Sequence, residues 1–196
     1  MLDLKRESPF AGLRPIGTGD GVVAVERIDL AIATVMARRD KSIELGTTVA
    51  RHYGMALPTG VKWAGNNGVM FLGTGPGKWL TIRDAQDPDF VANLEIQLQG
   101  LASVADQSGA LGVLRLTGPA LLPTLEKGLQ IDLAPGAFPA NSVAVTSIAH
   151  IGATLWKVDE QPTIDVAVAR SLATSFQHWL EVSAAVYGLS LQRSSK

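Results

Sequence analysis

The chain has 196 residues, of which 17 are lysine or arginine, 18 are aspartate or glutamate and none is cysteine. Counting glycine and leaving out tyrosine, about 55% of the residues are apolar, against about 45–50% in typical globular proteins, so intrinsic disorder is excluded. The near-zero net charge excludes the field of a nucleic-acid or anionic-membrane binder, and the absence of cysteine excludes disulfides, thiolate metal sites and cysteine nucleophiles.

No apolar run approaches the ~18 residues of a transmembrane helix. The charged N-terminal segment MLDLKRESPF lacks the apolar stretch of a signal peptide. A cytoplasmic globular protein is therefore expected. Its 18% of charged residues, against a typical ~25%, leaves it short of the charges that keep a small protein soluble alone.

The chain is predicted to begin with an irregular arm. Residues 1–21 contain prolines and glycines without a sustained period, and the SPFAGL segment within them is expected to lie on another surface. The β-branched run 22–37 predicts one long strand or two short ones. A helical period follows, with Ser42 as the predicted cap and Pro58 as the predicted end.

The middle of the chain continues with a hairpin and a helix. Two apolar runs, GVMFLG and KWLTIRD, flank a glycine–proline turn and predict a β-hairpin. Asp87 and Pro88 predict the start of the next helix. Residues 103–118 are predicted to be extended, with a bend or bulge at Gly109 and Gly112.

The last third repeats this alternation. A short helix is predicted after Pro119, followed by two strands that turn near His150. The strand TIDVAVA comes next, and Asp165 in it points away from its apolar neighbours. The last helix is predicted to begin at Ser171 and to stop at Gly188.

This order of elements consists of two successive β-α-β-β-α units. It predicts an α+β protein made of two interlocked ferredoxin-like (split βαβ) halves. The single domain is predicted to span residues 22–190, with halves of about 22–108 and 109–190, and residues 191–196 are expected to be a disordered tail. No composition shift or linker separates the halves.

Two glycine-rich segments resemble phosphate-binding loops only superficially. In GTGPGKW, residues 73–79, Leu72 stands where the first glycine is required and Trp79 where a serine or threonine would bind Mg²⁺. A tight hairpin turn is predicted there instead. The segment GTGDG at 17–21 follows no strand and is also predicted to be a turn.

Candidate catalytic and metal-binding residues are scarce. No pair among His52, His150 and His178 is separated by three or four residues, and each is predicted to lie at the core edge or the surface. No catalytic or metal-binding residue is predicted. Asp106, in the segment DQSG, has two interpretations: it caps the glycine turn, or it binds the amide of a ligand.

The four tryptophans are predicted to anchor the core or an interface.

Several strings occur in an order and spacing that resemble the gamma subunits of heterotetrameric sarcosine oxidases. They are SPFAGL, GPGKWL, DQSGALGVLRLTGP, LEKGLQIDLAPGAFP, SVAVTSIAHIGATLWKVD and TIDVAVARSLATSFQHWL. The resemblance is dense from about Gly75 to Gly188. It implies the fold of the folate-binding domain of aminomethyltransferases, the glycine-cleavage T-proteins.

The assembly of this family oxidises sarcosine to glycine, and the resemblance implies a non-catalytic structural role for this chain within it. The alpha, beta and delta subunits are then the expected partners. FAD, FMN, NAD, zinc and tetrahydrofolate are expected in those other subunits and none of them in this chain. Relatives that bind folate use adjacent acidic residues, but Asp159 and Glu160 lie in a different turn, so no folate-binding residue is transferred.

Two functions from different classes follow. The first is the structural gamma subunit, which is expected to self-associate when isolated because its apolar surface awaits partners. The alternative is a stand-alone tetrahydrofolate-binding or one-carbon-transfer module with Asp106 as its candidate ligand residue. Titration with a reduced folate discriminates between them.

Overall fold

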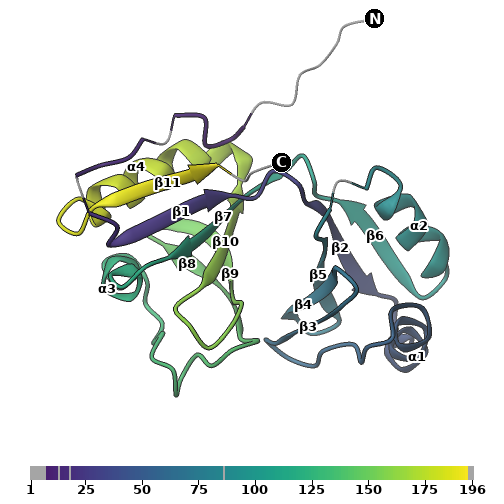
Figure 1. The fold of residues 1–196 in the computed structure, drawn as a ribbon. Helices are drawn as coiled ribbons and strands as arrows, with labels where there is room; N and C mark the ends of the chain where they lie inside the picture. The colour runs from purple at the N-terminus through teal and green to yellow at the C-terminus, as the bar shows by residue number, and fades with distance from the viewer. Residues whose placement is uncertain (1–7, 13, 18, 86, 194–196) are drawn as a thin grey trace, which may run out of the picture.

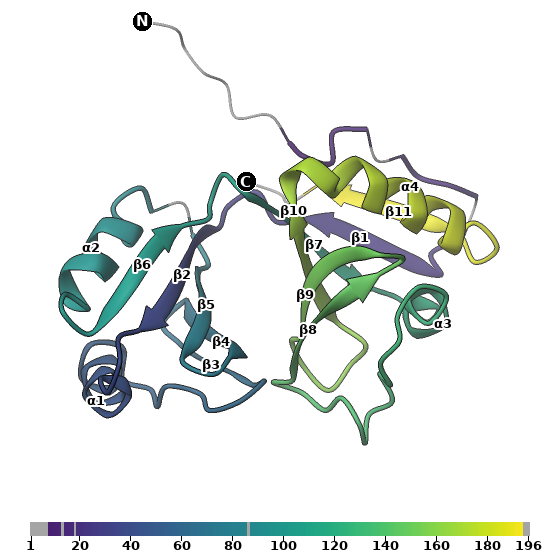
Figure 2. The same ribbon diagram turned by 180° about the vertical axis from the view of Figure 1, so that it is seen from behind.

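The computed structural model describes residues 8–12, 14–17, 19–85 and 87–193. Two β-sheets lie side by side, and helices cover their outer faces (Figure 1; Figure 2 shows the reverse side). The layers therefore run helices, sheet, sheet, helices, and the protein belongs to the α+β class, as predicted.

The five-stranded sheet comes from one contiguous part of the chain. Its strands are β2 (Ala31–Ala37), β3 (Trp63–Asn66), β4 (Val69–Gly75), β5 (Lys78–Arg83) and β6 (Ala102–Asp106). Their order is β3-β4-β5-β2-β6, and every neighbouring pair is antiparallel. The helices α1 (Ser42–Tyr53) and α2 (Phe90–Gln97) cover its outer face with their buried leucine, valine and phenylalanine side chains.

The six-stranded sheet collects strands from both ends of the chain. Its strands are β1 (Val22–Glu26), β7 (Leu111–Thr117), β8 (Val143–Ile148), β9 (Ile151–Lys157), β10 (Ile164–Ala169) and β11 (Leu189–Arg193). Their order is β11-β1-β7-β10-β9-β8, and only the β1–β11 pair is parallel. The helices α3 (Leu121–Leu125) and α4 (Ala173–Ala184) cover its outer face.

Several predicted elements are confirmed. GVMFLG and KWLTIRD form the β4–β5 hairpin around the predicted glycine–proline turn. TIDVAVA contains β10, in which Ile164, Val166 and Val168 join the core under the helices. Asp165 alternates to the opposite face, where it is fully buried.

Neighbouring strands in the sequence belong to different sheets at two places. Residues 22–37 form two short strands, one of the two predicted alternatives, but β1 lies in the six-stranded sheet and β2 in the five-stranded one. Residues 103–118 are likewise β6 and β7 of different sheets rather than one bent strand. The change from β6 to β7 lies at the predicted boundary between the halves 22–108 and 109–190, so only β1 departs from them. Its sequence pattern does not reveal which sheet provides its hydrogen-bonding partners.

The C-terminal segment differs from the expected disordered tail. Residues 191–193 belong to β11, which pairs in parallel with β1. The pairing supplies main-chain hydrogen bonds that a short segment cannot form alone, and β1 is about 170 residues away in sequence, so no local signal reports it. Residues 194–196 of the predicted tail lie outside the described residues. The sequence also missed β3.

The ends of the first helix differ from the prediction. Ser42 is the first residue of α1, and no side-chain hydrogen bond caps this helix. The helix ends at Gly54, before Pro58, because Gly54 adopts φ 64° and donates its N–H to the carbonyl of Ala50. Glycine takes up this left-handed conformation without a steric penalty.

The starts predicted for the second and the last helix are each shifted, whereas the short helix predicted after Pro119 is α3. α2 begins at Phe90, although the carboxylate of Asp87 accepts the N–H of Asp89 at 3.2 Å and so shapes the turn before it. α4 begins after a 3₁₀ turn that contains Ser171, and it ends before Gly188 is reached. In the ranges that the structure describes, no helix is long and apolar enough to cross a membrane.

The described part of the N-terminal arm packs on the chain's own six-stranded sheet. Phe10, in SPFAGL, is 3% exposed and meets the ring of Phe176 edge-on, with centroids 6.5 Å apart. Ser8 donates its hydroxyl hydrogen to Glu26 of β1 at 2.5 Å. Gly112 leaves room for the ring, because a Cβ there would lie 2.8 Å from Phe10. Residues 1–7 of the predicted arm lie outside the described residues.

Candidate functional site at the junction of the two sheets

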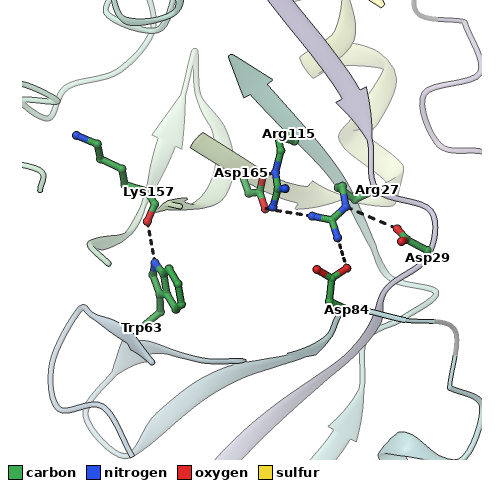
Figure 3. Close-up of polar contacts among 7 residues, drawn as sticks. All are labelled: Arg27, Asp29, Trp63, Asp84, Arg115, Lys157 and Asp165. Carbon is green, nitrogen blue, oxygen red and sulfur yellow. Dashed lines mark hydrogen bonds and ion pairs between the residues drawn. The ribbon is translucent and has the colours of Figure 1, made fainter. Parts of the chain in front are cut away.

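The inner faces of the two sheets meet over an apolar cluster that includes Ile32, Leu80 and Ile82 on one side and Val113 and Trp156 on the other. Polar contacts flank this cluster (Figure 3). Five charged residues form what we call the inter-sheet charge cluster: Arg27, Asp29, Asp84, Arg115 and Asp165.

Asp165 occupies the centre of the inter-sheet charge cluster. Its side chain is 1% exposed and accepts hydrogen bonds from Nε and Nη2 of Arg115 at 2.7 and 2.8 Å. The two residues lie directly opposite each other on β10 and β7, so their side chains leave the sheet on the same face. The hydrogen bond to Asp165 raises the pKa of Arg115 against the opposing effect of desolvation, which keeps the guanidinium charged.

Arg27 extends the inter-sheet charge cluster from one sheet to the other. Its side chain is 8% exposed, and its Nη1 lies 3.7 Å from Oδ2 of Asp165. Its Nη2 donates to Asp84, which directly follows β5 of the five-stranded sheet. Its Nε lies 3.6 Å from Asp29 in the connection to β2. Arg27 therefore links the two sheets through charged contacts.

The inter-sheet charge cluster is suited to a structural role. Two guanidinium groups face three carboxylates, and each group is engaged with an opposite charge of the same chain. Separating a buried ion pair leaves a buried charge without its partner, which is unfavourable. The pairs therefore hold the strands that carry them in one arrangement. The outer contacts, to the 40% exposed Asp29 and the 44% exposed Asp84, are screened by water and contribute less.

A second link ties the sheets on the far side of the apolar cluster. Trp63 of β3 donates its indole N–H to the main-chain carbonyl of Lys157 on β9, at 2.7 Å (Figure 3). Beside it, the N–H of Trp63 donates to Asn141, and the N–H of Val143 donates to Val61. The junction is thus closed by ion pairs on one side and by main-chain hydrogen bonds on the other.

Asp106, for which turn capping and ligand binding were the two interpretations, caps its turn in this structure. It is the last residue of β6 and is exposed, and its Oδ1 accepts the main-chain N–H of Ser108 at 2.8 Å. This contact shapes the DQSG turn. Asp106 does not take part in the inter-sheet charge cluster.

The three histidines lie on separate elements and are all exposed: His52 on α1, His150 in the β8–β9 turn and His178 on α4. In the part of the chain that the structure describes, no three histidines and carboxylates gather into a potential metal site. The glycine-rich segment 73–79 forms the predicted turn of the β4–β5 hairpin.

The tryptophans serve as core and junction anchors. Trp79 and Trp156 are buried, whereas Trp63 and Trp179 are half-buried. Trp79 donates its indole N–H to the carbonyl of Pro58 at 2.9 Å and so holds the loop after α1 against the hairpin.

The inter-sheet charge cluster was not predicted from the sequence. The available signal was a charged residue isolated in an apolar strand, namely Asp165 in TIDVAVA and Arg115 in LRLTG. An acid or a base at such a position is seldom buried without a partner. Recognising the partner requires knowledge that β7 and β10 are neighbours, which only the sheet order provides.

Known proteins include clear relatives of this chain, although no protein-family model matches it. It is 31% identical to the sarcosine oxidase gamma subunit of Corynebacterium sp. strain U-96 over 164 residues, which cover 82% of this chain and 79% of the relative. It is also 31% identical to the gamma subunit from Corynebacterium sp. strain P-1 over 180 residues, covering 89% and 88%.

Solved structures agree with this relationship. A chain of the heterotetrameric sarcosine oxidase of Corynebacterium sp. U-96, in complex with pyrrole 2-carboxylate, matches with a TM-score of 0.81 and 27% identity, covering 93% of this chain and 96% of that one. The glycine cleavage system aminomethyltransferase T of Bartonella henselae shares the fold, with a TM-score of 0.66 and 10% identity, over 88% of this chain and 47% of that one. By its sequence identity over most of its length, the chain belongs to the sarcosine oxidase gamma subunit family.

Proposed function

We propose that this chain is the non-catalytic, structural gamma subunit of a heterotetrameric sarcosine oxidase, an enzyme that oxidatively demethylates sarcosine to glycine with flavins and tetrahydrofolate. The observation that carries the proposal is the match to gamma subunits over 79–88% of their length, together with the structural match over 96% of a chain of such an enzyme. A cytoplasmic location goes with this role.

The junction between the sheets supports a structural role. Its interior is filled by apolar side chains, and its charged groups neutralise one another within the chain. Asp106, the candidate for ligand binding, is exposed and engaged with its own turn. We therefore assign the flavins FAD and FMN, NAD, zinc and tetrahydrofolate to the alpha, beta and delta subunits.

The outer face of α4 supports the presence of partners. Leu172 in the 3₁₀ turn before α4, Val182 on α4 and Val186 in the turn after it are 40%, 62% and 76% exposed, and the half-buried Trp179 lies on α4. Apolar side chains that gather on one face of a helix are typical of surfaces that another protein covers. The same surface accounts for the expected self-association of the isolated chain.

We interpret the fold as two split βαβ units. The first is β2-α1-β4-β5-α2-β6, in which β5 lies between β4 and β2. The second is β7-α3-β9-β10-α4-β11, in which β10 lies between β9 and β7 and β1 is inserted before β11. The insertion of β1 from the N-terminal side is what interlocks the halves.

Co-expression with the other three subunits tests the proposal. A tagged chain is expected to recover the alpha, beta and delta subunits with their flavin absorbance. Omitting it is expected to reduce assembly, while the flavins stay bound to the remaining subunits. A stable monomer that recovers none of them contradicts the proposal, and flavin that copurifies with this chain alone contradicts its non-catalytic role.

Calorimetric titration with a reduced folate tests the alternative function, the tetrahydrofolate module. We expect no saturable heat from the isolated chain. Saturable binding at micromolar concentration that is lost in Asp106→Ala would favour the alternative.

A further inference from the structure

The outer face of the six-stranded sheet carries a row of three polar side chains near its β8 edge. Lys157 on β9 donates its main-chain N–H to the carbonyl of Ser142, and Lys62 forms an isolated antiparallel bridge with Ser142 from the other side. Residues opposite each other in antiparallel strands direct their side chains to the same face. We call Lys62, Ser142 and Lys157 the lysine row.

The two lysines lie on either side of Ser142. Lys62 donates from Nζ to Oγ of Ser142 at 3.0 Å. From the spacing of neighbouring strands, the two lysine Cα atoms are roughly 10 Å apart, within the combined reach of their side chains. Figure 3 shows the side chain of Lys157 extending away from Trp63 and from the inter-sheet charge cluster. The main chain of the lysine row thus takes part in the link between the sheets, while the side chain of Lys157 leaves β9 on the face opposite to that of Trp156 and so points away from the inter-sheet charge cluster.

Among the described cations, Lys157 combines an almost completely buried side chain with an ammonium group that pairs with no carboxylate. Only 4% of the residue is exposed, and Ser142 beside it is also 4% exposed. Among the described residues, neither Lys157 nor Lys62 forms an ion pair with a carboxylate. Arg27 is similarly buried and contacts three carboxylates. The Nζ of Lys157 is not among the fully buried polar atoms without a hydrogen-bond partner, so the tip of this otherwise buried side chain reaches the surface, where a partner can meet it.

We propose that the lysine row is a docking point for an aspartate or glutamate side chain of another subunit in the assembly, an inference that rests on the proposed function. A carboxylate that reaches the row gains the charge partner that Lys157 lacks. It also receives hydrogen bonds from two ammonium groups, and charge-assisted hydrogen bonds are the strong ones. A carboxylate that belongs to another subunit is held in place by the rest of the interface. A free carboxylate ion would have to compensate for its lost translational and rotational entropy through the contacts at this one site.

Zero-length cross-linking of the assembled complex tests this contact directly. A water-soluble carbodiimide joins an amine to a carboxylate, and mass spectrometry identifies the joined peptides. We expect a link from Lys157 or Lys62 to an aspartate or glutamate of another subunit. Links from these lysines only to carboxylates of this chain would overturn the proposal.

Substitution provides the second measurement. We expect Lys157→Met to weaken recruitment of the other subunits by about tenfold or more, because truncating one member of a buried charge pair strongly affects dissociation. Lys62→Met, at the exposed side, should weaken it by about threefold, and Lys157→Arg should restore most of the affinity. Lys78→Met is the matched control, since Lys78 is an exposed lysine on the other sheet.

The outcomes separate this inference from the proposed function. If the wild-type chain recruits no subunit, the assembly role itself is wrong and the docking role falls with it. If wild type assembles but Lys157→Met and Lys62→Met assemble as tightly as Lys78→Met, only the docking role is wrong. Should Lys157→Met lose its native circular dichroism spectrum, Lys62→Met and the cross-links still decide.

Discussion

The two sheets of this protein are assembled from the chain in different ways. The five-stranded sheet uses the contiguous segment from Ala31 to Asp106. The six-stranded sheet needs β1 from the N-terminal side and β11 from the C-terminal end, paired in parallel. The first therefore depends mainly on local turns and helices, whereas the second depends on contacts between distant segments. The inter-sheet charge cluster, centred on the six-stranded sheet, belongs to the second kind.

The largest expected effect comes from removing the charge at the centre of that cluster. Asp165→Asn leaves Arg115 and Arg27 without their buried carboxylate, and we expect the free energy of unfolding in urea to fall by about 3–5 kcal/mol. Asp84→Asn is the control, because its side chain is 44% exposed, and it should cost no more than about 1 kcal/mol. Equal stability of the two variants would show that the cluster does not hold the sheets.

A second variant tests the dependence of the six-stranded sheet on its terminal strands. Gly188, just before β11, has φ 84°, and a Cβ there would lie 2.2 Å from the carbonyl oxygen of Gly19. We expect Gly188→Ala to lower stability by about 1–3 kcal/mol. Amide hydrogen exchange should accelerate in β1 and β11 first and leave β2, β4 and β5 protected.

Gly152→Ala is the matched control for that variant, since Gly152 lies in β9, has no positive φ and has open space where a methyl group would be added. Its stability should stay within about 0.5 kcal/mol of wild type. Uniformly faster exchange in both sheets of Gly188→Ala would contradict the distinction between local and distant assembly.

One hairpin turn in each sheet has two residues with positive φ, and the two turns differ in how well their residues suit that conformation. The β3–β4 hairpin turns at Asn67 and Gly68, with φ 50° and 76°, whereas the β8–β9 hairpin turns at Ala149 and His150, with φ 47° and 68°. Asn-Gly is the favoured pair for such a turn, and Ala-His is not. His150→Gly should therefore raise stability by about 0.5–1 kcal/mol, measured by thermal unfolding. His150→Ala keeps a Cβ and should give no gain in stability. Equal melting temperatures of the two variants would contradict the inference that the Cβ strains this turn.

The smallest expected effect concerns the core of the five-stranded sheet. Burial raises the pKa of Tyr53 above 10.0, against the opposing charge of Arg83, and the phenol donates to Gln97 at 2.6 Å. Because the folded state favours the neutral phenol, its stabilising contribution is complete below pH 10 and is lost as the pH rises through the folded pKa. Tyr187→Phe leaves Tyr53 as the sole tyrosine, so tyrosinate absorbance reports it alone. A titration midpoint of this absorbance at or below pH 10 would contradict the raised pKa of Tyr53.

Much of the local structure could be predicted because it depends on neighbouring residues. The β4–β5 hairpin, β10 and the turn at residues 73–79 follow from alternation and from glycine and proline positions. Helix ends were less predictable. Gly54 ends α1 by its left-handed conformation, although the later Pro58 is the stronger sequence signal.

The candidate sites show the same division. The hydrogen bond from Ser108 to Asp106 spans two residues, so the turn-capping interpretation could be made from the sequence. The pairing of Arg115 with Asp165 spans 50 residues, and that of Arg27 with Asp84 spans 57. Those partners become neighbours only when β7, β10 and the two sheets take their places.

The sequence by itself determined the α+β class, most strands, a core rich in apolar residues and the resemblance to the gamma subunit family. These depend on composition and on short-range periodicity, which each segment carries independently of its surroundings. Only the tertiary structure decided that β1 crosses into the six-stranded sheet, that β11 exists, and that buried Asp165 has two arginines while buried Lys157 has no carboxylate partner among the described residues. The physical reason is that burial and charge pairing are properties of distant segments brought together, so no single segment encodes them.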